Sequence, residues 1–300
     1  MKGNKGLIIP GKENREIKTI QCVQIKFIYP RWGSSEIPWP VFLNNIKKAG
    51  YQGVEIDLPL ESIKKNEICS MLQDLELDFV AQHWETKEVN FTKHQEQYKR
   101  HLHNLVEASP LFVNSHTGMD FFTRRQNSAL IETAHEIELE SGVTITHETH
   151  RSRFSFAAHV CLSYLEEYPF LKLTSDLSHW CCVAESLLEN QAYAVEKAIE
   201  HTYHIHARVG SAQSPQVIDP RDRNYKTELQ RFTEWWGFMI AKALEKKRSY
   251  ITITPEYGPH PYSIYKANTR MPLGDQWEIN NFIKNHLAES VKHIPKIICP

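Results

Sequence analysis

Residues 142–151 read Gly-Val-Thr-Ile-Thr-His-Glu-Thr-His-Arg, and residues 251–256 nearly repeat them as Ile-Thr-Ile-Thr-Pro-Glu. Both runs are rich in β-branched residues and alternate in character, which indicates β-strands. Because the side chains of a strand alternate between its two faces, the two threonines of each run share one face with the glutamate that follows them. These glutamates are Glu148 and Glu256. We therefore predict that the two strands form two walls of one polar site.

The length and the net charge limit the classes of protein to which the chain can belong. The chain has 300 residues, 41% of them hydrophobic, enough for one (β/α)-type domain or two ordinary ones. Its net charge of -1 predicts neither nucleic acid nor a membrane as a partner. Residues 1–19 are polar and lack the apolar core of a signal peptide, so we expect an N-terminal extension there, one domain over residues 20–300 and a cytoplasmic location. The six cysteines form no CxxC pair, which favours reduced thiols.

Strands and helices alternate along the rest of the chain. Strand candidates span residues 20–29, 53–58, 77–84, 111–116, 142–151, 170–176, 202–209 and 249–256. Helical patterns separate them, and a last helix is expected over residues 276–292. Such alternation predicts a parallel sheet, and eight units in about 250 residues fit a closed barrel. A doubly wound open sheet is the alternative, but the sequence has neither GxGxxG nor GxxxxGK[ST]. We therefore predict an α/β fold, a single-domain (β/α)8 TIM barrel.

In such a barrel the active site lies at the carboxyl ends of the strands. The fifth, sixth and eighth strands end at Glu148, Asp176 and Glu256, and the seventh ends at His206 or Arg208. Three carboxylates that open into one mouth repel one another unless a cation neutralises them. Oxygen donors with one imidazole suit Mn²⁺, Mg²⁺, Co²⁺ or Zn²⁺ without selecting among them. The alternative is that arginines or lysines pair with these carboxylates in purely structural ion pairs.

Several other side chains are expected near this mouth. His179 follows Asp176 by three residues, and Arg208 shares a strand face with His206. A guanidinium in that place suits an anionic or hydroxylated substrate. His83 and His116 end the third and fourth strands, where they either line the opposite rim and contact substrate or make structural hydrogen bonds. By contrast, His147 should face the helix layer, and His94, in a polar helix, should be solvated.

These residues resemble the xylose isomerase-like TIM barrels, the sugar phosphate isomerase/epimerase superfamily. The resemblance covers residues 21–287 approximately, and it is carried by Glu148, Asp176-Leu-Ser-His179, His206 and Glu256 in that order. The segments that begin at Asn114-Ser-His-Thr-Gly and Pro215-Gln-Val-Ile-Asp also resemble a bacterial subgroup of uncharacterised sugar isomerase-like proteins.

The resemblance implies a chemistry for these positions. A divalent metal would be held by Glu148, Asp176, His206 and Glu256, with His179 near the substrate. Glu148 and Glu256 would exchange a proton at the carbon next to a carbonyl, and the metal would stabilise an enediolate. The related epimerases carry a substrate-binding arginine six residues after the metal histidine, where this chain has Ala212. Arg208, Gln216 and Arg221 are the candidates to replace that arginine.

The sequence thus predicts a metal-dependent sugar isomerase or epimerase that acts on a small sugar or polyol. One alternative is an endonuclease IV-like phosphodiesterase of the same superfamily, in which His83 and His116 would hold further metal ions. The even balance of 35 basic and 36 acidic residues argues against such a DNA enzyme. Another alternative is a carbohydrate-binding barrel without turnover. The sugar, its phosphorylation, the metal and the formation of a homo-oligomer are left open.

Overall fold

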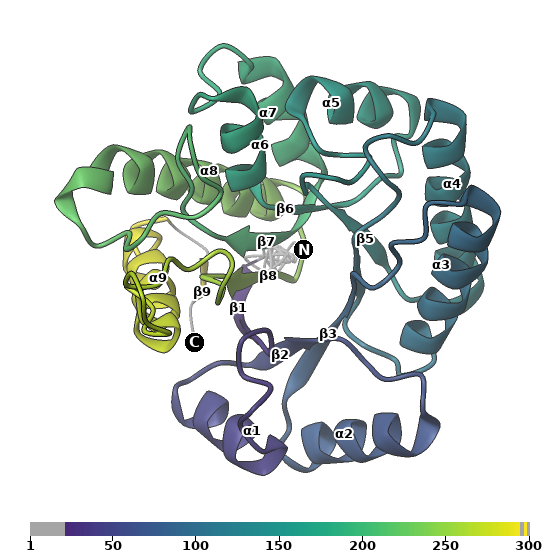
Figure 1. The fold of residues 1–300 in the computed structure, drawn as a ribbon, viewed down its shortest axis with the longest axis horizontal. Coiled ribbons are helices and arrows are strands. Elements are labelled where there is room, and N and C mark those ends of the chain that lie inside the picture. Colours follow the sequence, from purple (N-terminus) through teal and green to yellow (C-terminus); the bar gives the residue numbers. More distant parts are fainter. Residues whose placement is uncertain (1–21, 295–296, 299–300) are drawn as a thin grey trace, which may run out of the picture.

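A computed structural model describes residues 22–294 and 297–298 of the chain, and in it eight parallel strands close into a ring (Figure 1). The strands are β1 (Val23–Pro30), β2 (Gly53–Ile56), β3 (Asp78–His83), β4 (Val113–Ser115), β5 (Ile145–Glu148), β6 (Leu173–Ser175), β7 (Thr202–Ala207) and β8 (Tyr250–Pro255). Each strand pairs with its neighbour in the sequence, and β1 closes the ring by pairing with both β8 and β2. The predicted (β/α)8 TIM barrel is confirmed.

The length of β1 allows it to close the ring. Its first half pairs with β8, where Gln24 lies opposite Tyr250, and its last residues pair with β2, where Ile28 lies opposite Gly53. A short ninth strand, β9 (Ile297–Ile298), pairs with the beginning of β1. The sequence analysis did not predict β9, which has only two residues and no pattern to reveal it.

Helices surround the ring of strands on its outer side (Figure 1). They are α1 (Trp39–Lys48), α2 (Ser62–Asp74), α3 (Phe91–Val106), α4 (Arg124–Ser141), α5 (Ala158–Glu167), α6 (Leu177–Ala184), α7 (Ala192–His201), α8 (Lys226–Glu245) and α9 (Gln276–Ser290), with a 3-10 turn η1 (Arg223–Tyr225) before α8. Two of them, α6 and α7, lie between β6 and β7, where the sequence analysis expected one helical region. None of the described helices has the length and apolar character needed to cross a bilayer.

Local sequence signals set the ends of α4, the helix that leads into β5. Thr123 and Gln126 form a reciprocal capping box at its start, which satisfies backbone N–H groups of the first turn. Gly142 ends the helix with a φ of 71°, a left-handed conformation that glycine adopts without a Cβ penalty. The chain then turns directly into β5, which carries Glu148 to the end of the barrel.

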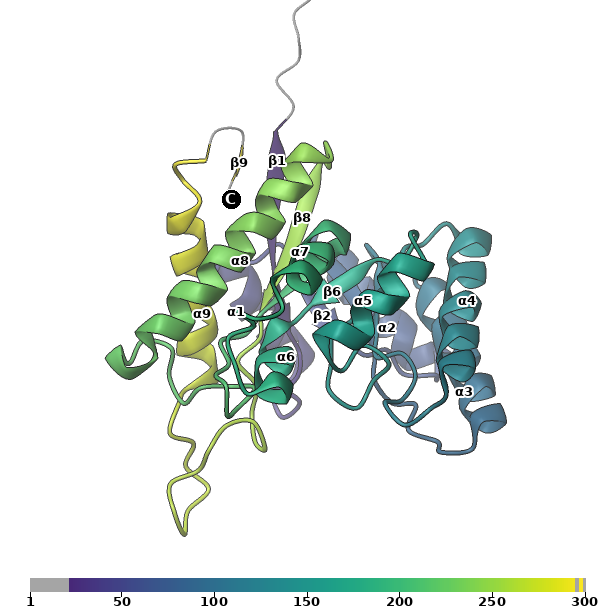
Figure 2. The same ribbon diagram turned by 90° about the horizontal axis from the view of Figure 1, so that it is seen from above.

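Most of the apolar core lies between the strands and the helices, where the β-branched strand residues pack on the buried faces of the helices. A smaller buried cluster contains Ile28, Val80 and Phe112. The ring of Phe112 lies 5.1 Å from the ring of His204, so this apolar cluster adjoins a layer of polar side chains. The loop after β8, residues 256–275, extends beyond the rest of the barrel end at which the strands finish (Figure 2).

The structure corrects the expectation for His94, and it does not test the expected boundary at the N-terminus. His94 was expected to be solvated, which is wrong: its side chain is buried, its ring lies 5.0 Å from that of Phe122, and its Nδ1 is 2.8 Å from the carbonyl oxygen of Glu88. His147 is buried and bonded to Thr117 Oγ1 through Nδ1 at 2.7 Å. The expected extension at residues 1–19 lies outside the described residues, and the domain boundary at residue 20 stays a prediction.

Candidate metal centre

The four residues expected to hold a metal converge at one point. Glu148, Asp176, His206 and Glu256 each offer a ligand atom, and these atoms all lie within 4.8 Å of one another. All four side chains are buried, Glu256 being the most exposed at 4%. They come from four consecutive strand ends, β5 to β8, as a parallel barrel requires. Residues 108 positions apart in the chain, Glu148 and Glu256, thereby share one mouth.

The local backbone aims one oxygen of Asp176 into this cluster. Asp176 is the N-cap residue of α6, and its Oδ1 accepts hydrogen bonds from the backbone N–H and the hydroxyl of Ser178, at 3.0 and 2.5 Å. Its Oδ2 accepts a bond from Arg208 Nε at 3.0 Å. Burial raises the pKa of Asp176 to about 6, although the Arg208 guanidinium opposes that rise. One carboxylate thus caps a helix and faces the site at the same time.

His206 joins two clusters through its two ring nitrogens. Its Nε2 lies 3.0 Å from each oxygen of Glu55. Its Nδ1 lies 2.9 Å from Glu256 Oε2 and 3.5 Å from Glu148 Oε1, and it forms no hydrogen bond with the described residues. Burial alone would lower the pKa of His206, but the carboxylates of Glu256, Glu55 and Glu148 raise it well above its usual value. The carboxylates therefore favour the protonated ring in the metal-free protein, and a cation bound between Nδ1 and the carboxylate oxygens would take the place of the Nδ1 proton.

Arg208 forms the ion pairs that the alternative interpretation of the sequence required. Its Nε donates to Asp176 at 3.0 Å and its Nη2 donates to Glu256 Oε2 at 2.6 Å, with all three side chains buried. Glu148 instead has His116 Nε2 at 2.7 Å from its Oε2. With the His206 ring neutral, as a metal ligand must be, these three carboxylates and the guanidinium leave two negative charges, which one divalent cation would balance. The donor set therefore fits a divalent metal even with Arg208 in place.

The remaining expected site residues differ in how closely they approach this cluster. Both ring nitrogens of His179 are buried without a hydrogen-bond partner among the described residues, and Nε2 lies 3.6 Å from Asp176 Oδ2. His116 contacts Glu148 directly. His83 instead places Nε2 at 2.8 Å from Thr86 Oγ1 and lies in none of the ligand clusters of the described residues. His179 and His116 thus adjoin the site, whereas a role of His83 in substrate binding stays a prediction.

The three candidates to replace the missing epimerase arginine make different contacts in the structure. Gln216 is buried, and its amide both donates to the carbonyl of Gly258 at 3.1 Å and accepts from its N–H at 2.7 Å. Arg221 pairs with Asp219 at 2.8 Å and with Glu278 at 3.4 Å. These contacts tie loops together, so of the three candidates only Arg208 has its guanidinium against the carboxylates of Asp176 and Glu256.

Aromatic side chains from loops cover the cluster. The Arg208 guanidinium carbon lies 4.4 Å from the ring centre of Tyr262 and 5.5 Å from that of Trp32. The Tyr262 hydroxyl is 3.2 Å from Nε2 of His150, which follows β5. Trp32 follows β1, and Tyr262 belongs to the long loop after β8. Three loops therefore meet over the polar centre and restrict its contact with water.

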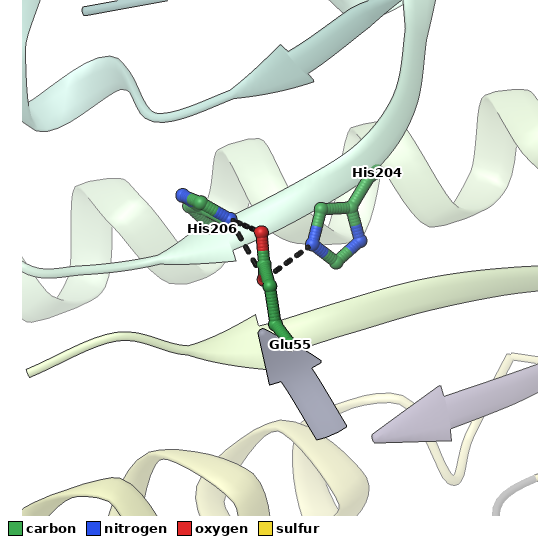
Figure 3. A group of neighbouring side chains, drawn as sticks. All are labelled: Glu55, His204 and His206. Atoms are coloured by element: carbon green, nitrogen blue, oxygen red, sulfur yellow. Dashed lines mark hydrogen bonds and ion pairs between the residues drawn. The ribbon is translucent and has the colours of Figure 1, made fainter. Parts of the chain in front are cut away.

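Two buried polar residues that the sequence analysis did not select lie directly behind the ligands. Glu55, on β2, is 2% exposed and points toward His204 and His206 of β7 (Figure 3). Asn114, on β4, donates to Glu55 Oε1 at 2.9 Å and to Glu148 Oε2 at 3.1 Å. Glu55 lies one residue before the end of β2, whereas the expected site residues were taken from strand ends only. The usable sequence signal was a glutamate between the apolar Val54 and Ile56 within a predicted strand.

No family model matches the chain, and no curated protein matches it. Solved structures do resemble it. A 3-keto-D-glucoside 4-epimerase from E. coli in its apo form has a TM-score of 0.57 at 13% identity, over 88% of this chain and 99% of that one. A xylose isomerase domain-containing protein from Salmonella typhimurium has a TM-score of 0.57 at 11% identity, over 89% and 97%.

A probable 3-DHS dehydratase from Bacillus anthracis also aligns, with a TM-score of 0.52 at 12% identity, over 79% of this chain and 94% of that one. At these identities the likeness concerns the fold, and proteins of this fold carry out different reactions. The chain therefore has the fold of the xylose isomerase-like TIM barrels, as the residue pattern predicted.

Proposed function

We propose that this protein is a divalent-metal-dependent isomerase or epimerase that moves a proton next to the carbonyl of a small sugar or polyol-derived ketone. The observation that carries the proposal is the convergence of Glu148, Asp176, His206 and Glu256 within 4.8 Å, buried at the strand ends. Carboxylates in a buried cluster are unfavourable unless a cation neutralises them, and the uncompensated pair of charges suits a divalent ion. The names of the epimerase and the xylose isomerase domain protein with the same fold agree with this class.

The four ligand residues would hold the metal, which when bound acts as a Lewis acid on substrate oxygens and stabilises negative charge next to a carbonyl. Glu148 and Glu256 are the candidates for proton transfer because they approach the cluster from two different strands, β5 and β8. One carboxylate would remove the proton from carbon, and the other, as the acid, would return one. His116, 2.7 Å from Glu148, would influence the protonation state of that carboxylate.

Side chains around the ligands would bind and orient the substrate. Neither ring nitrogen of His179 has a hydrogen-bond partner within the part of the chain that the structure describes, so one can donate to and the other accept from a sugar hydroxyl. Arg208 has its Nη1 buried without a hydrogen-bond partner among the described residues, which leaves a donor for a substrate oxygen. Trp32 and Tyr262 would exclude water from the reacting carbon, since they lie over Arg208. The exclusion of water would lower the local dielectric constant and so strengthen the electrostatic interactions inside the site.

The test is proton exchange in heavy water. The metal-free protein is loaded separately with Mn²⁺, Co²⁺, Mg²⁺ or Zn²⁺ and incubated with a panel of ketoses, aldoses, keto-glycosides and inososes in D₂O. Deuterium at a carbon next to a carbonyl, with an isomerised or epimerised product, is the expected result. A sugar that binds without any deuterium uptake would favour the carbohydrate-binding barrel, and cleavage of a duplex with an abasic site would favour the phosphodiesterase.

A further inference from the structure

The polar layer behind the candidate ligands contains a carboxylate with no place in the proposed chemistry. Glu55 accepts hydrogen bonds from four side chains on three other strands (Figure 3 shows the two histidines). Asn114 Nδ2 lies at 2.9 Å, His206 Nε2 at 3.0 Å, Thr254 Oγ1 at 2.7 Å and His204 Nε2 at 3.3 Å. With its oxygens hydrogen-bonded in this way, Glu55 has few lone pairs left and is a poor ligand for a cation of its own.

The position of Glu55 determines which nitrogen of His206 carries the proton. A carboxylate only accepts hydrogen bonds, so the nitrogen that faces it must be protonated. His206 Nε2 is 3.0 Å from both oxygens of Glu55, which places the N–H on Nε2. By the same rule Nδ1, 2.9 Å from Glu256 Oε2, carries a proton in the metal-free protein, and a divalent metal held by Glu148, Asp176 and Glu256 would replace that proton and take the Nδ1 lone pair.

The neighbouring histidine also contacts Glu55. His204 Nε2 lies 3.3 Å from Glu55 Oε2, and its Nδ1 lies 3.0 Å from the carbonyl oxygen and 2.7 Å from the Oγ1 of Thr252, so its ring is held between β2 and β8. Asn114 keeps Glu55 in place and at the same time donates to Glu148. Each of these side chains is buried, and their mutual bonds allow little freedom of rotation. The layer is therefore a rigid support for the ring of His206.

We propose that Glu55 is a positioning residue that holds His206 in the Nε2–H tautomer and thereby presents Nδ1 to the divalent metal. This inference rests on the proposed function, because it assumes that the cluster binds a metal. A carboxylate behind a histidine ligand fixes the orientation of the ring and increases its basicity, and the loss of such a partner weakens metal affinity about 10–100-fold. Glu55 itself touches neither the substrate nor the metal in this account.

The experiment measures metal affinity and the histidine tautomer separately. Zn²⁺ binding by calorimetry and ¹⁵N spectra of the histidine rings are compared for the full-length protein, Glu55→Gln, Asp176→Asn and Asp57→Asn. Glu55→Gln keeps the shape of the side chain and removes its charge. Asp57 lies just beyond β2 and is exposed, so Asp57→Asn is the matched control for the loss of one negative charge.

We expect Glu55→Gln to weaken Zn²⁺ binding about 10–100-fold and to reduce the Nε2–H signal of His206. Asp176→Asn should weaken binding while leaving that tautomer unchanged, and Asp57→Asn should alter neither. If the unaltered protein binds Zn²⁺ and Glu55→Gln binds it equally well, the role of Glu55 is overturned while the proposed function stands. If the unaltered protein binds no divalent ion at all, both proposals fail.

Discussion

Arg208 Nη2 donates a 2.6 Å hydrogen bond to Glu256 Oε2, and both side chains are buried. This pair lies in the same cluster that would hold a metal, so the guanidinium and the metal would share the carboxylates. Burial lowers the pKa of Arg208, but Glu256 and Asp176 outweigh that effect and raise it above its usual value. Arg208 is therefore a permanent positive charge that compensates part of the buried negative charge of Asp176 and Glu256.

Replacement of Arg208 by methionine should destabilise the metal-free protein. The change leaves Asp176 and Glu256 buried without their guanidinium partner, and breaking a buried ion pair from one side costs about 3–5 kcal/mol. Urea unfolding of the metal-free proteins measures this loss. Added Mn²⁺ should restore more stability to Arg208→Met than to the unaltered protein, because the cation can neutralise the same carboxylates.

Arg231→Met is the control for this change, since Arg231 pairs with Glu234 on the outer surface of α8, where ion pairs contribute little. A metal-free Arg208→Met protein as stable as the control would show that the mouth does not need the guanidinium.

Substitution of either glutamate by glutamine should stop proton exchange without unfolding the protein. Glu148→Gln and Glu256→Gln keep the size of each side chain and remove the group that takes or returns the proton. We expect deuterium uptake to fall by about 10²–10⁴-fold in each variant, measured by mass spectrometry of the sugar at saturating metal. Glu245→Gln, on the exposed surface of α8, is the control and should exchange normally. Unchanged exchange in both variants would contradict the proposed mechanism.

His94 should make the fold sensitive to acid. Burial lowers the pKa of His94 although its bond to the Glu88 carbonyl opposes this, so the folded protein binds that proton less tightly than the unfolded chain does. At high pH the neutral His94 costs the fold nothing. As pH falls below about 6.5, the unfolded chain takes up the proton first, and the free energy of unfolding decreases with a limiting slope of about 1.4 kcal/mol per pH unit. Urea midpoints of the unaltered protein and His94→Gln at pH 8, 6 and 5 test this. The variant should lose less stability between pH 8 and 5, and parallel curves would argue against a role for His94.

The strand ends were predictable because the signals for them are local. Residues 142–148 combine a helix-ending glycine, β-branched alternation and a glutamate, and the barrel rule then places Glu148 in the mouth. The same rule selected Asp176 and Glu256, and it left His206 and Arg208 as alternatives at the end of the seventh strand. The resemblance to the xylose isomerase-like barrels then singled out His206 as the ligand, whereas the other three residues needed only the order of strands along the chain.

The supporting layer was not predictable in the same way because its partners are distant in the sequence. Glu55 and His206 are 151 positions apart, and Glu55 and Thr254 are 199 apart. Nothing local to β2 shows that its glutamate will meet two histidines of β7 inside the ring. The error at His94 has a similar cause, since the polar composition of α3 suggested solvent exposure while Phe122, from beyond β4, covers the ring.

The central claim is that four strand ends jointly bind one divalent cation, and anomalous diffraction from a crystal soaked in Mn²⁺ tests it most directly. We expect one strong anomalous peak enclosed by Glu148, Asp176, Glu256 and the Nδ1 of His206. A map without a peak there, in which Arg208 alone neutralises Asp176 and Glu256, would contradict it.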